Sequence, residues 1–232
     1  MTKLGLKGAI LSALGDDDYG KRAMEEIKAL GMDTSFISTT PFETGKAMIT
    51  LNGKNADYEL NSPCAWDNIP YLPLPEKVSL IYYGTLAQRS EGSRETLKRV
   101  LREVSSDHRF FDVNIRKHFY SDEIIRKGVE AATILKLNDE EEEIVLSSLG
   151  IKERGLSGLE KLYRDYSLDL ILLTCGKDGT MCYKDKWYRV PCASVPVVDT
   201  VGAGDSLSAG FLAQYIRTGD LERSLIAGSH IA

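Results

Sequence analysis

Apolar segments typical of buried strands alternate with segments of helical periodicity along most of this chain. Strands are predicted at residues 6–14, 78–83, 109–113, 133–137 and 168–174, and a hairpin at 180–183 and 187–190. Helices are predicted at residues 21–30, 93–104, 140–149, 157–166 and 205–216. Strands that alternate with helices form a mainly parallel sheet with helices on both faces. We therefore expect a three-layer α/β fold.

One stretch interrupts this alternation. Between residues 36 and 69, short β-rich runs at 47–51 and 58–60 flank Asn52-Gly53-Lys54-Asn55, a sequence typical of a hairpin turn. The expected organisation is an α/β core formed by residues 1–35 and 70–232, with residues 36–69 inserted as a small β-rich lid.

The composition and charge of the chain limit the kinds of molecule that it is expected to bind. The chain has 232 residues, of which 43% are hydrophobic and 27% charged, which suits one globular domain. A net charge of −5 disfavours a nucleic-acid partner. No apolar run approaches the length of a membrane span, and the first residues show no signal-peptide pattern, so no membrane partner is expected.

The cysteines show no pattern of a zinc site or a disulfide framework. Cys64, Cys175, Cys182 and Cys192 include no Cys-x-x-Cys pair, and the three histidines are scattered. We interpret the cysteines as free thiols and expect the protein to be cytoplasmic.

The most informative motif is Asp199-Thr200-Val201-Gly202-Ala203-Gly204-Asp205-Ser206, between an extended segment and a predicted helix. The two glycines allow backbone amides to face outward, and the start of a helix adds a positive dipole end, so the loop suits a phosphate. Asp205 would place negative charge beside that anion, which makes sense if it accepts a proton from an attacking hydroxyl. The alternative is a glycine-rich turn in which Asp205 is an ordinary N-cap.

Further motifs follow in a fixed order along nearly the whole chain. They are Ala13-Leu14-Gly15-Asp16-Asp17-Asp18-Tyr19-Gly20, Glu43-Thr44-Gly45-Lys46-Ala47, Asp112-Val113-Asn114-Ile115-Arg116, Lys136-Leu137-Asn138-Asp139-Glu140-Glu141 and Leu173-Thr174-Cys175-Gly176-Lys177-Asp178-Gly179. With residues 199–206 they resemble the motifs of the ribokinase-like (PfkB) carbohydrate kinases. Tyr58-Glu59-Leu60 and Ala65-Trp66-Asp67-Asn68-Ile69 are similar to the fructokinase branch in particular.

The resemblance implies ATP-dependent transfer of the γ-phosphate to a hydroxyl of a fructose-like sugar, within a ribokinase-like fold. Gly202, Ala203 and Gly204 would supply amides to the transferring phosphate, and Asp205 would be the base. Arg116 could clamp a phosphate or sugar oxygen, or could be a surface arginine paired with a carboxylate. A nucleoside or sugar-acid kinase is the alternative within enzymes.

Cofactor sites follow from the same resemblance. Asn138 and Glu141 would organise Mg²⁺ through water, although an N-cap asparagine with an acidic first turn explains them equally well. Residues expected to line the nucleotide are Thr174, Gly176, Gly179, Asn138 and Thr200. Asp199 and the Val201 carbonyl would bind a monovalent cation such as K⁺.

The family's sugar-binding segments have no counterpart in these residues. The resemblance places a strand with a substrate aspartate and a Gly-Gly segment before the point that residue 1 matches, and a further helix after residue 232. We expect the chain alone to leave apolar surface uncovered around residues 6–14 and beneath residues 171–173. It should therefore self-associate or be less stable than a longer parent. We also expect it to lack measurable sugar kinase activity. The rival hypothesis is a catalytically silent paralogue that binds nucleotide or forms a homodimer through its lid.

Overall fold

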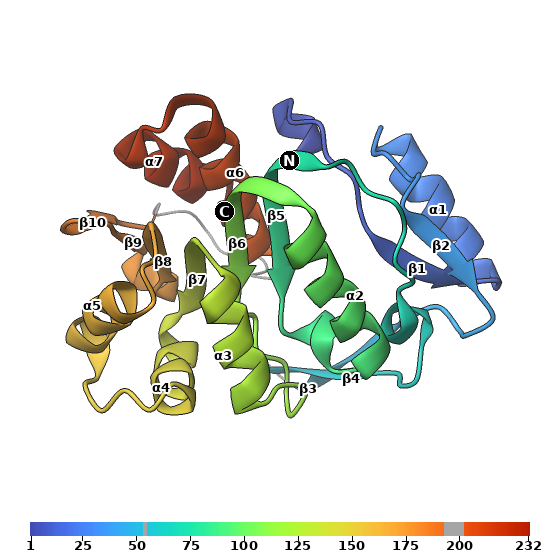
Figure 1. Ribbon diagram of the computed structural model, residues 1–232, viewed down its shortest axis with the longest axis horizontal. Coiled ribbons are helices and arrows are strands. Elements are labelled where there is room, and N and C mark those ends of the chain that lie inside the picture. Colours follow the sequence, from blue (N-terminus) through green and yellow to red (C-terminus); the bar gives the residue numbers. More distant parts are fainter. Residues whose placement is uncertain (53–54, 193–201) are drawn as a thin grey trace.

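A parallel sheet with an antiparallel extension forms the centre of the molecule (Figure 1). The computed structural model describes residues 1–52, 55–192 and 202–232. Within them, six strands lie in the order β10-β9-β8-β7-β6-β5. They are β5 (Lys77–Gly84), β6 (Ser105–Asp112), β7 (Ile134–Asn138), β8 (Leu170–Thr174), β9 (Thr180–Tyr183) and β10 (Trp187–Val190). β5 to β8 are parallel, and β9 and β10 are antiparallel, so the predicted mainly parallel sheet is confirmed.

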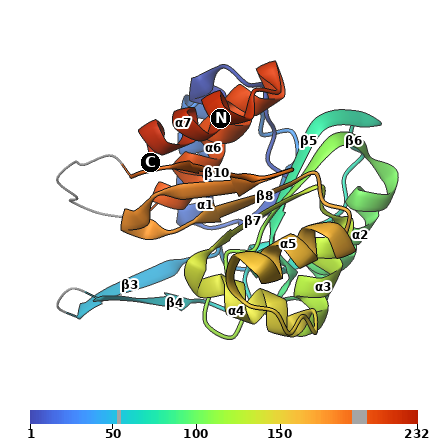
Figure 2. The ribbon, with the colours of Figure 1, turned by 90° about the vertical axis from the view of Figure 1, so that its left-hand side faces the viewer.

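Helices cover both faces of this sheet and complete the predicted three layers (Figures 1 and 2). One face carries α2 (Glu91–Glu103), α3 (Asp122–Ala131), α4 (Asp139–Ser148) and α5 (Gly155–Asp165). The other face carries α6 (Ala203–Thr218) and α7 (Leu221–Ile231).

The two hydrophobic cores follow from the alternation of side chains along each strand. Phe111, Leu135 and Ile171 belong to the core under α3, α4 and α5. The residues that precede them, Phe110, Ile134 and Leu170, belong to the core under α6 and α7. Consecutive residues of these strands are thus apolar, as expected for strands that are buried on both faces.

Polar residues meet at the carboxyl ends of the parallel strands. The strand register pairs Gly84 with Asp112, Asp112 with Lys136, and Asn138 with Thr174. In open α/β sheets, ligands bind at the carboxyl ends of the strands. The apolar strands therefore end in a row of polar groups where a site is expected.

The amino-terminal region differs from its predicted form. The strand predicted at residues 6–14 is wrong in its extent, because only Ser12–Gly15 form β1, and Thr2–Leu4 form the short 3-10 helix η1. β1 pairs in parallel with β2 (Ile37–Thr40), which offers partners to only four residues. α1 (Asp18–Ala29) begins before the predicted residue 21, because the Asp17 side chain accepts a hydrogen bond from the Gly20 N–H.

The predicted hairpin is present as β3 (Ala47–Asn52) and β4 (Asn55–Leu60), paired antiparallel with Ala47 opposite Leu60. Figure 2 shows this hairpin projecting from the body of the molecule. β2 also lies between residues 36 and 69, but it pairs with β1 and not with the hairpin.

The expectation of uncovered apolar surface beneath residues 171–173 is wrong. Ile171 and Leu172 are fully buried and Leu173 is 5% exposed, because helices pack on both sides of β8. β5 is an edge strand within the described residues. In the same part of the chain, no helix has the length and apolar character needed to cross a membrane.

Candidate active site

The glycine-rich loop ends directly at the start of α6. Gly202 is the N-cap residue and has φ 80°, a left-handed conformation that glycine adopts without steric cost. The Ser206 N–H donates to the Gly202 carbonyl oxygen at 2.8 Å, which closes the first helical turn. The preceding amides at the helix start lack partners inside the helix and carry its positive dipole end. A helix start of this kind suits an anion, and phosphate binding by the loop stays a prediction.

Asp205 lies in the first turn of α6 and is exposed. Since Gly202 is the N-cap, the alternative in which Asp205 caps the helix is wrong. The carboxylate is therefore available to a ligand above the loop. Three members of the same motif, Asp199, Thr200 and Val201, lie outside the described residues.

A buried ion pair lies beneath the loop, and sequence reasoning missed it. Lys136 Nζ lies 2.9 Å from Asp112 Oδ1, and the two side chains are 8% and 1% exposed. A Cβ atom added to Gly204 would lie 3.5 Å from Lys136 Nζ, so the ammonium group is adjacent to the loop.

A tyrosine hydroxyl completes this cluster. The Tyr82 hydroxyl donates to Asp112 Oδ2 at 2.6 Å. Burial, followed by the Asp112 carboxylate, raises the pKa of Tyr82, and the Asp205 carboxylate adds to the shift. The cluster therefore connects the strand ends with the first turn of α6.

Two charged residues in the predicted strands could have indicated this cluster. Asp112 ends β6, and Lys136 lies within an otherwise apolar run of β7. A lysine there is unusual, because lysine is almost never fully buried unless it is paired.

Asn138 and Glu141 form a capping box at the start of α4. Asn138 Oδ1 accepts from the Glu141 N–H at 2.8 Å, and Glu141 Oε2 accepts from the Asn138 N–H at 2.9 Å. Glu141 Oε1 accepts from the Ile115 N–H at 2.7 Å, which ties the segment after β6 to α4. The capping role that the sequence left open is thus present.

Burial raises the pKa of Glu141, although hydrogen bonds from the Asn138 and Ile115 amides oppose the shift. The described residues contain no group of three or more His, Cys, Asp and Glu side chains able to hold a metal directly. Asn138 and Glu141 nevertheless offer the hard oxygen atoms that suit a Mg²⁺ ion that keeps most of its water. Each of these oxygen atoms already accepts one backbone hydrogen bond, so a Mg²⁺ ion held through water there stays a prediction.

The expected nucleotide residues lie beyond the next strand end. Thr174 ends β8 beside Asn138 of β7. Gly176 begins the 3-10 helix η4 (Gly176–Asp178), and Gly179 follows it with φ 92°. A Cβ atom on Gly179 would lie 2.2 Å from the Val190 carbonyl oxygen, so the turn itself requires glycine there.

Arg116 lies on the segment after β6, and its side chain is exposed. Among the described residues it forms no ion pair. Both the predicted clamp for a phosphate or sugar oxygen and the alternative of a surface arginine paired with a carboxylate stay predictions. Asn114, two residues before it, has φ 41°.

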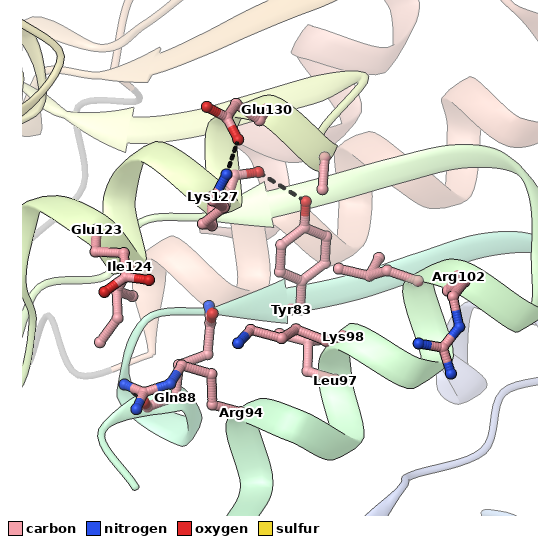
Figure 3. Close-up of a pocket in the computed structure, with 13 residues that line it drawn as sticks. Tyr83, Gln88, Arg94, Leu97, Lys98, Arg102, Glu123, Ile124, Lys127 and Glu130 are labelled. Carbon is pink, nitrogen blue, oxygen red and sulfur yellow. Dashed lines mark hydrogen bonds and ion pairs between the residues drawn. The ribbon is translucent and has the colours of Figure 1, made fainter. Parts of the chain in front are cut away.

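A cavity of about 470 Å³ lies elsewhere, between α2 and α3 (Figure 3). Tyr83 forms its floor and donates a hydrogen bond from its hydroxyl to the Gly128 carbonyl oxygen at 2.9 Å. Lys127 at its rim pairs with Glu130 at 2.7 Å. This cavity belongs to the face under α3, and the sheet separates it from the loop before α6, so we do not assign the phosphate chemistry to it.

Comparisons with known proteins agree with this geometry. The model of the pfkB family of carbohydrate kinases matches residues 1–232. The chain is 29% identical over 222 residues to a fructokinase of Rhizobium leguminosarum bv. trifolii, covering 91% of this chain and 67% of that protein.

Two solved structures show the same fold. The fructokinase of Vibrio cholerae O395, solved with fructose, ADP and calcium ion, has a TM-score of 0.84 at 19% identity over 98% of this chain and 78% of that one. The aminoimidazole riboside kinase of Salmonella enterica, solved with its riboside and an ATP analog, has a TM-score of 0.78 at 24% identity over 98% of this chain and 78% of that one.

Proposed function

This chain belongs to the pfkB family of carbohydrate kinases, and on that premise we propose that it transfers the γ-phosphate of ATP to a hydroxyl group of a fructose-like sugar. The observation that carries the proposal is the position of the Gly202-Ala203-Gly204-Asp205 segment at the start of α6, directly above the buried Lys136–Asp112 pair.

Phosphoryl transfer depends on positioning and on stabilisation of charge. The amides of Gly202, Ala203 and Gly204 would hold the transferring phosphate. Lys136 adds a positive charge below the same loop, and Asp112 and Tyr82 fix the direction of its ammonium group. Charge that develops on the phosphate oxygens would therefore meet donors on two sides.

Asp205 would accept the proton of the attacking hydroxyl. It is exposed, it follows the amide-rich loop by one residue, and it forms no ion pair within the described residues. A positioned general base of this kind contributes about 10²- to 10⁴-fold to the rate.

The nucleotide would lie along the ends of β7 and β8, against Thr174, Gly176 and Gly179. Asn138 and Glu141 would hold the water shell of Mg²⁺, and the ion would help to neutralise the charge of the phosphates. Thr200 beside the nucleotide, and a K⁺ site formed by Asp199 and the Val201 carbonyl, remain predictions from the motif.

A fructose-like sugar is the leading acceptor because the Rhizobium relative and the Vibrio neighbour are both fructokinases, the latter solved with fructose and ADP. Arg116 would contact the acceptor, since it lies on the segment after Asp112 and its side chain is exposed. A nucleoside is the alternative acceptor, supported by the riboside kinase neighbour. The hairpin of β3 and β4 would cover the acceptor as a lid, and its exposed Met48 marks the surface where a homodimer would form.

The proposal is tested by coupled ADP release with fructose, other hexoses, sugar acids and nucleosides, each with ATP and Mg²⁺. Fructose-dependent ADP release with a phosphorylated product supports the proposal. Nucleotide binding by calorimetry without acceptor-dependent release of ADP would instead identify a silent paralogue.

A further inference from the structure

We infer that Arg89 is a positioning residue, which joins the base of the β3–β4 hairpin to the segment that carries Arg116 and so aligns the acceptor-binding side of the site. The inference rests on the proposed function, because it assigns the acceptor to these two segments. Arg89 lies between the 3-10 helix η3 (Leu86–Gln88) and α2, on the connection that follows β5.

The guanidinium group of Arg89 binds the segment that follows the β3–β4 hairpin. Arg89 Nε donates to Asp67 Oδ1 at 2.7 Å, and Nη2 donates to Asp67 Oδ2 at 2.8 Å. Asp67 lies in the 3-10 helix η2 (Ala65–Asn68), a few residues after β4. Both side chains are 6% exposed, so this bidentate pair is almost completely withdrawn from water.

The charge state of this pair is held by its contacts. Burial alone would raise the pKa of Asp67, but hydrogen bonds from Arg89 and from the Cys64 amide lower it below its ordinary value. Burial and the Asp67 carboxylate raise the pKa of the Cys64 thiol to about 11. Asp67 therefore stays ionised beside Arg89, and Cys64 stays a neutral thiol.

A chain of hydrogen bonds continues from Arg89 to the other strand of the hairpin. Arg89 Nη2 donates to the Asn61 carbonyl oxygen at 2.7 Å. Asn61 Oδ1 accepts from the Lys46 N–H at 2.7 Å, and its amide nitrogen donates to the Thr44 carbonyl oxygen at 3.3 Å. The residues that precede β3 and those that follow β4 are thus fixed to one another and to Arg89.

The same chain reaches the start of α1. Thr44 Oγ1 donates to Asp17 Oδ1 at 2.7 Å, and the Thr44 N–H donates to Asp17 Oδ2 at 2.8 Å. These hydrogen bonds, with one from the Gly20 amide, lower the pKa of Asp17 to about 2. The base of the hairpin is therefore anchored on two sides, by Arg89 and by Asp17.

Aromatic rings extend the contact to the segment that carries Arg116. The Arg89 Cζ atom lies 5.1 Å from the centre of the Trp66 ring and 4.7 Å from that of Phe119. The Phe119 N–H donates to the Arg116 carbonyl oxygen at 3.0 Å. Trp66 in turn packs on Gly45, where an added Cβ would lie 3.0 Å from the indole ring.

One planar side chain thus contacts both segments, and lysine cannot reproduce the contact. A guanidinium group forms two parallel hydrogen bonds to a carboxylate and offers flat faces to aromatic rings, whereas an ammonium group is a point charge. Loss of this geometry should release the hairpin base and the Arg116 segment together and leave the nucleotide side in place. Small displacements of binding groups are enough to reduce catalysis strongly.

The variants that test this role are Arg89→Lys, Asp67→Asn and the double variant. The matched control is Arg99→Lys on α2. Arg99 also combines a carboxylate, Glu103 at 3.0 Å, with an aromatic ring, Tyr71 at 3.7 Å, but it is 50% exposed and lies on the outer helix.

Two measurements decide the outcome. In steady-state kinetics of the protein, Arg89→Lys should raise the KM for the sugar about 10-fold or more and leave the KM for ATP within about twofold, because only the acceptor side loses its alignment. In hydrogen exchange of the 232-residue chain, residues 61–69 and 114–120 should exchange faster together, and residues 134–138 and 170–174 should keep their rates. Arg99→Lys should change neither.

The role is overturned if Arg89→Lys and Asp67→Asn leave exchange at residues 114–120 unchanged. It is equally overturned if exchange rises to the same extent in β7 and β8, since that pattern indicates general loss of stability. Absence of sugar-dependent turnover in the wild-type protein would refute the proposed function, and the exchange experiment would still decide whether Arg89 joins the two segments.

Discussion

Replacing Lys136 by methionine is the sharpest single test of the site geometry. The substitution keeps the length and the apolar stem of the side chain and removes the charge that Asp112 faces at 2.9 Å. Asp112 is 1% exposed, so the carboxylate cannot turn to water instead. Removing one partner of a buried pair costs about 3–5 kcal/mol, because the other charge is left without compensation.

The structure favours the lower end of that range. The Tyr82 hydroxyl still donates to Asp112 at 2.6 Å, and a hydrogen bond to a charged group retains about 1.5–3 kcal/mol. We therefore expect a loss of about 3 kcal/mol in the free energy of unfolding. For a chain of this size, about 1 kcal/mol corresponds to about 2–4 °C, so the melting temperature should fall by about 6–12 °C.

The assay is thermal melting of a double-mutant cycle formed by Lys136→Met, Asp112→Asn and both together. The double variant should be more stable than the sum of the single effects predicts, by about 1–3 kcal/mol, because it removes both charges. Lys161→Met is the control. Its pair with Asp165 is 37% and 44% exposed, so its loss should cost less than about 1 kcal/mol. A fall of less than about 2 °C for Lys136→Met, or additive effects in the cycle, would refute the buried pair.

Three further predictions concern the chemistry. Asp205→Asn should lower kcat by about 10²- to 10⁴-fold with little change in nucleotide affinity, and near-normal turnover of this variant would rule out Asp205 as the base. Gly204→Val should weaken ATP binding, because its side chain points toward Lys136 Nζ, 3.5 Å from the added Cβ, and calorimetry with unchanged affinity would contradict a phosphate loop there. The pKa of Glu141 is raised in the folded state, so the folded protein keeps a proton there at pH values at which the unfolded chain has lost it. The contribution of this group to the free energy of unfolding is therefore full below its ordinary pKa of 4.5 and declines as the pH rises through the raised value. Glu141→Gln should therefore remove part of the fall in melting temperature above pH 4.5, and an unchanged slope would contradict the shift.

The sheet could be predicted from the sequence because its strands are buried on both faces. Residues 134–137 and 170–173 are almost entirely apolar, and such runs between amphipathic helices have few other solutions. Residues 6–14 look similar, yet only the last part forms a strand. Whether an apolar run forms a ladder depends on the length of its partner, and β2 has only four residues.

The site was predicted only where its residues are consecutive. Gly202 to Asp205 could be identified because the loop and the helix start lie next to each other in the sequence. The cluster of Tyr82, Asp112 and Lys136 comes from three different strands and depends on their register, which no local pattern encodes. Arg89 could not be identified for the same reason, because its partners Asp67 and Phe119 lie more than twenty residues before and after it in the sequence.

The connection after β6 unites these findings, because it is held at both ends. At one end, Asp112 holds Lys136 beneath the loop that precedes α6. At the other end, Phe119 packs on Arg89, which holds the base of the hairpin. Between them, the Ile115 N–H donates to Glu141, the residue that would organise the metal. A short segment thus contacts the proposed phosphate, metal and lid regions in turn, so a displacement at one end must be transmitted or absorbed within a few residues. If the proposed chemistry is correct, Asp112→Asn should change the KM for the sugar as well as stability, whereas loss of a purely local ion pair would affect stability alone.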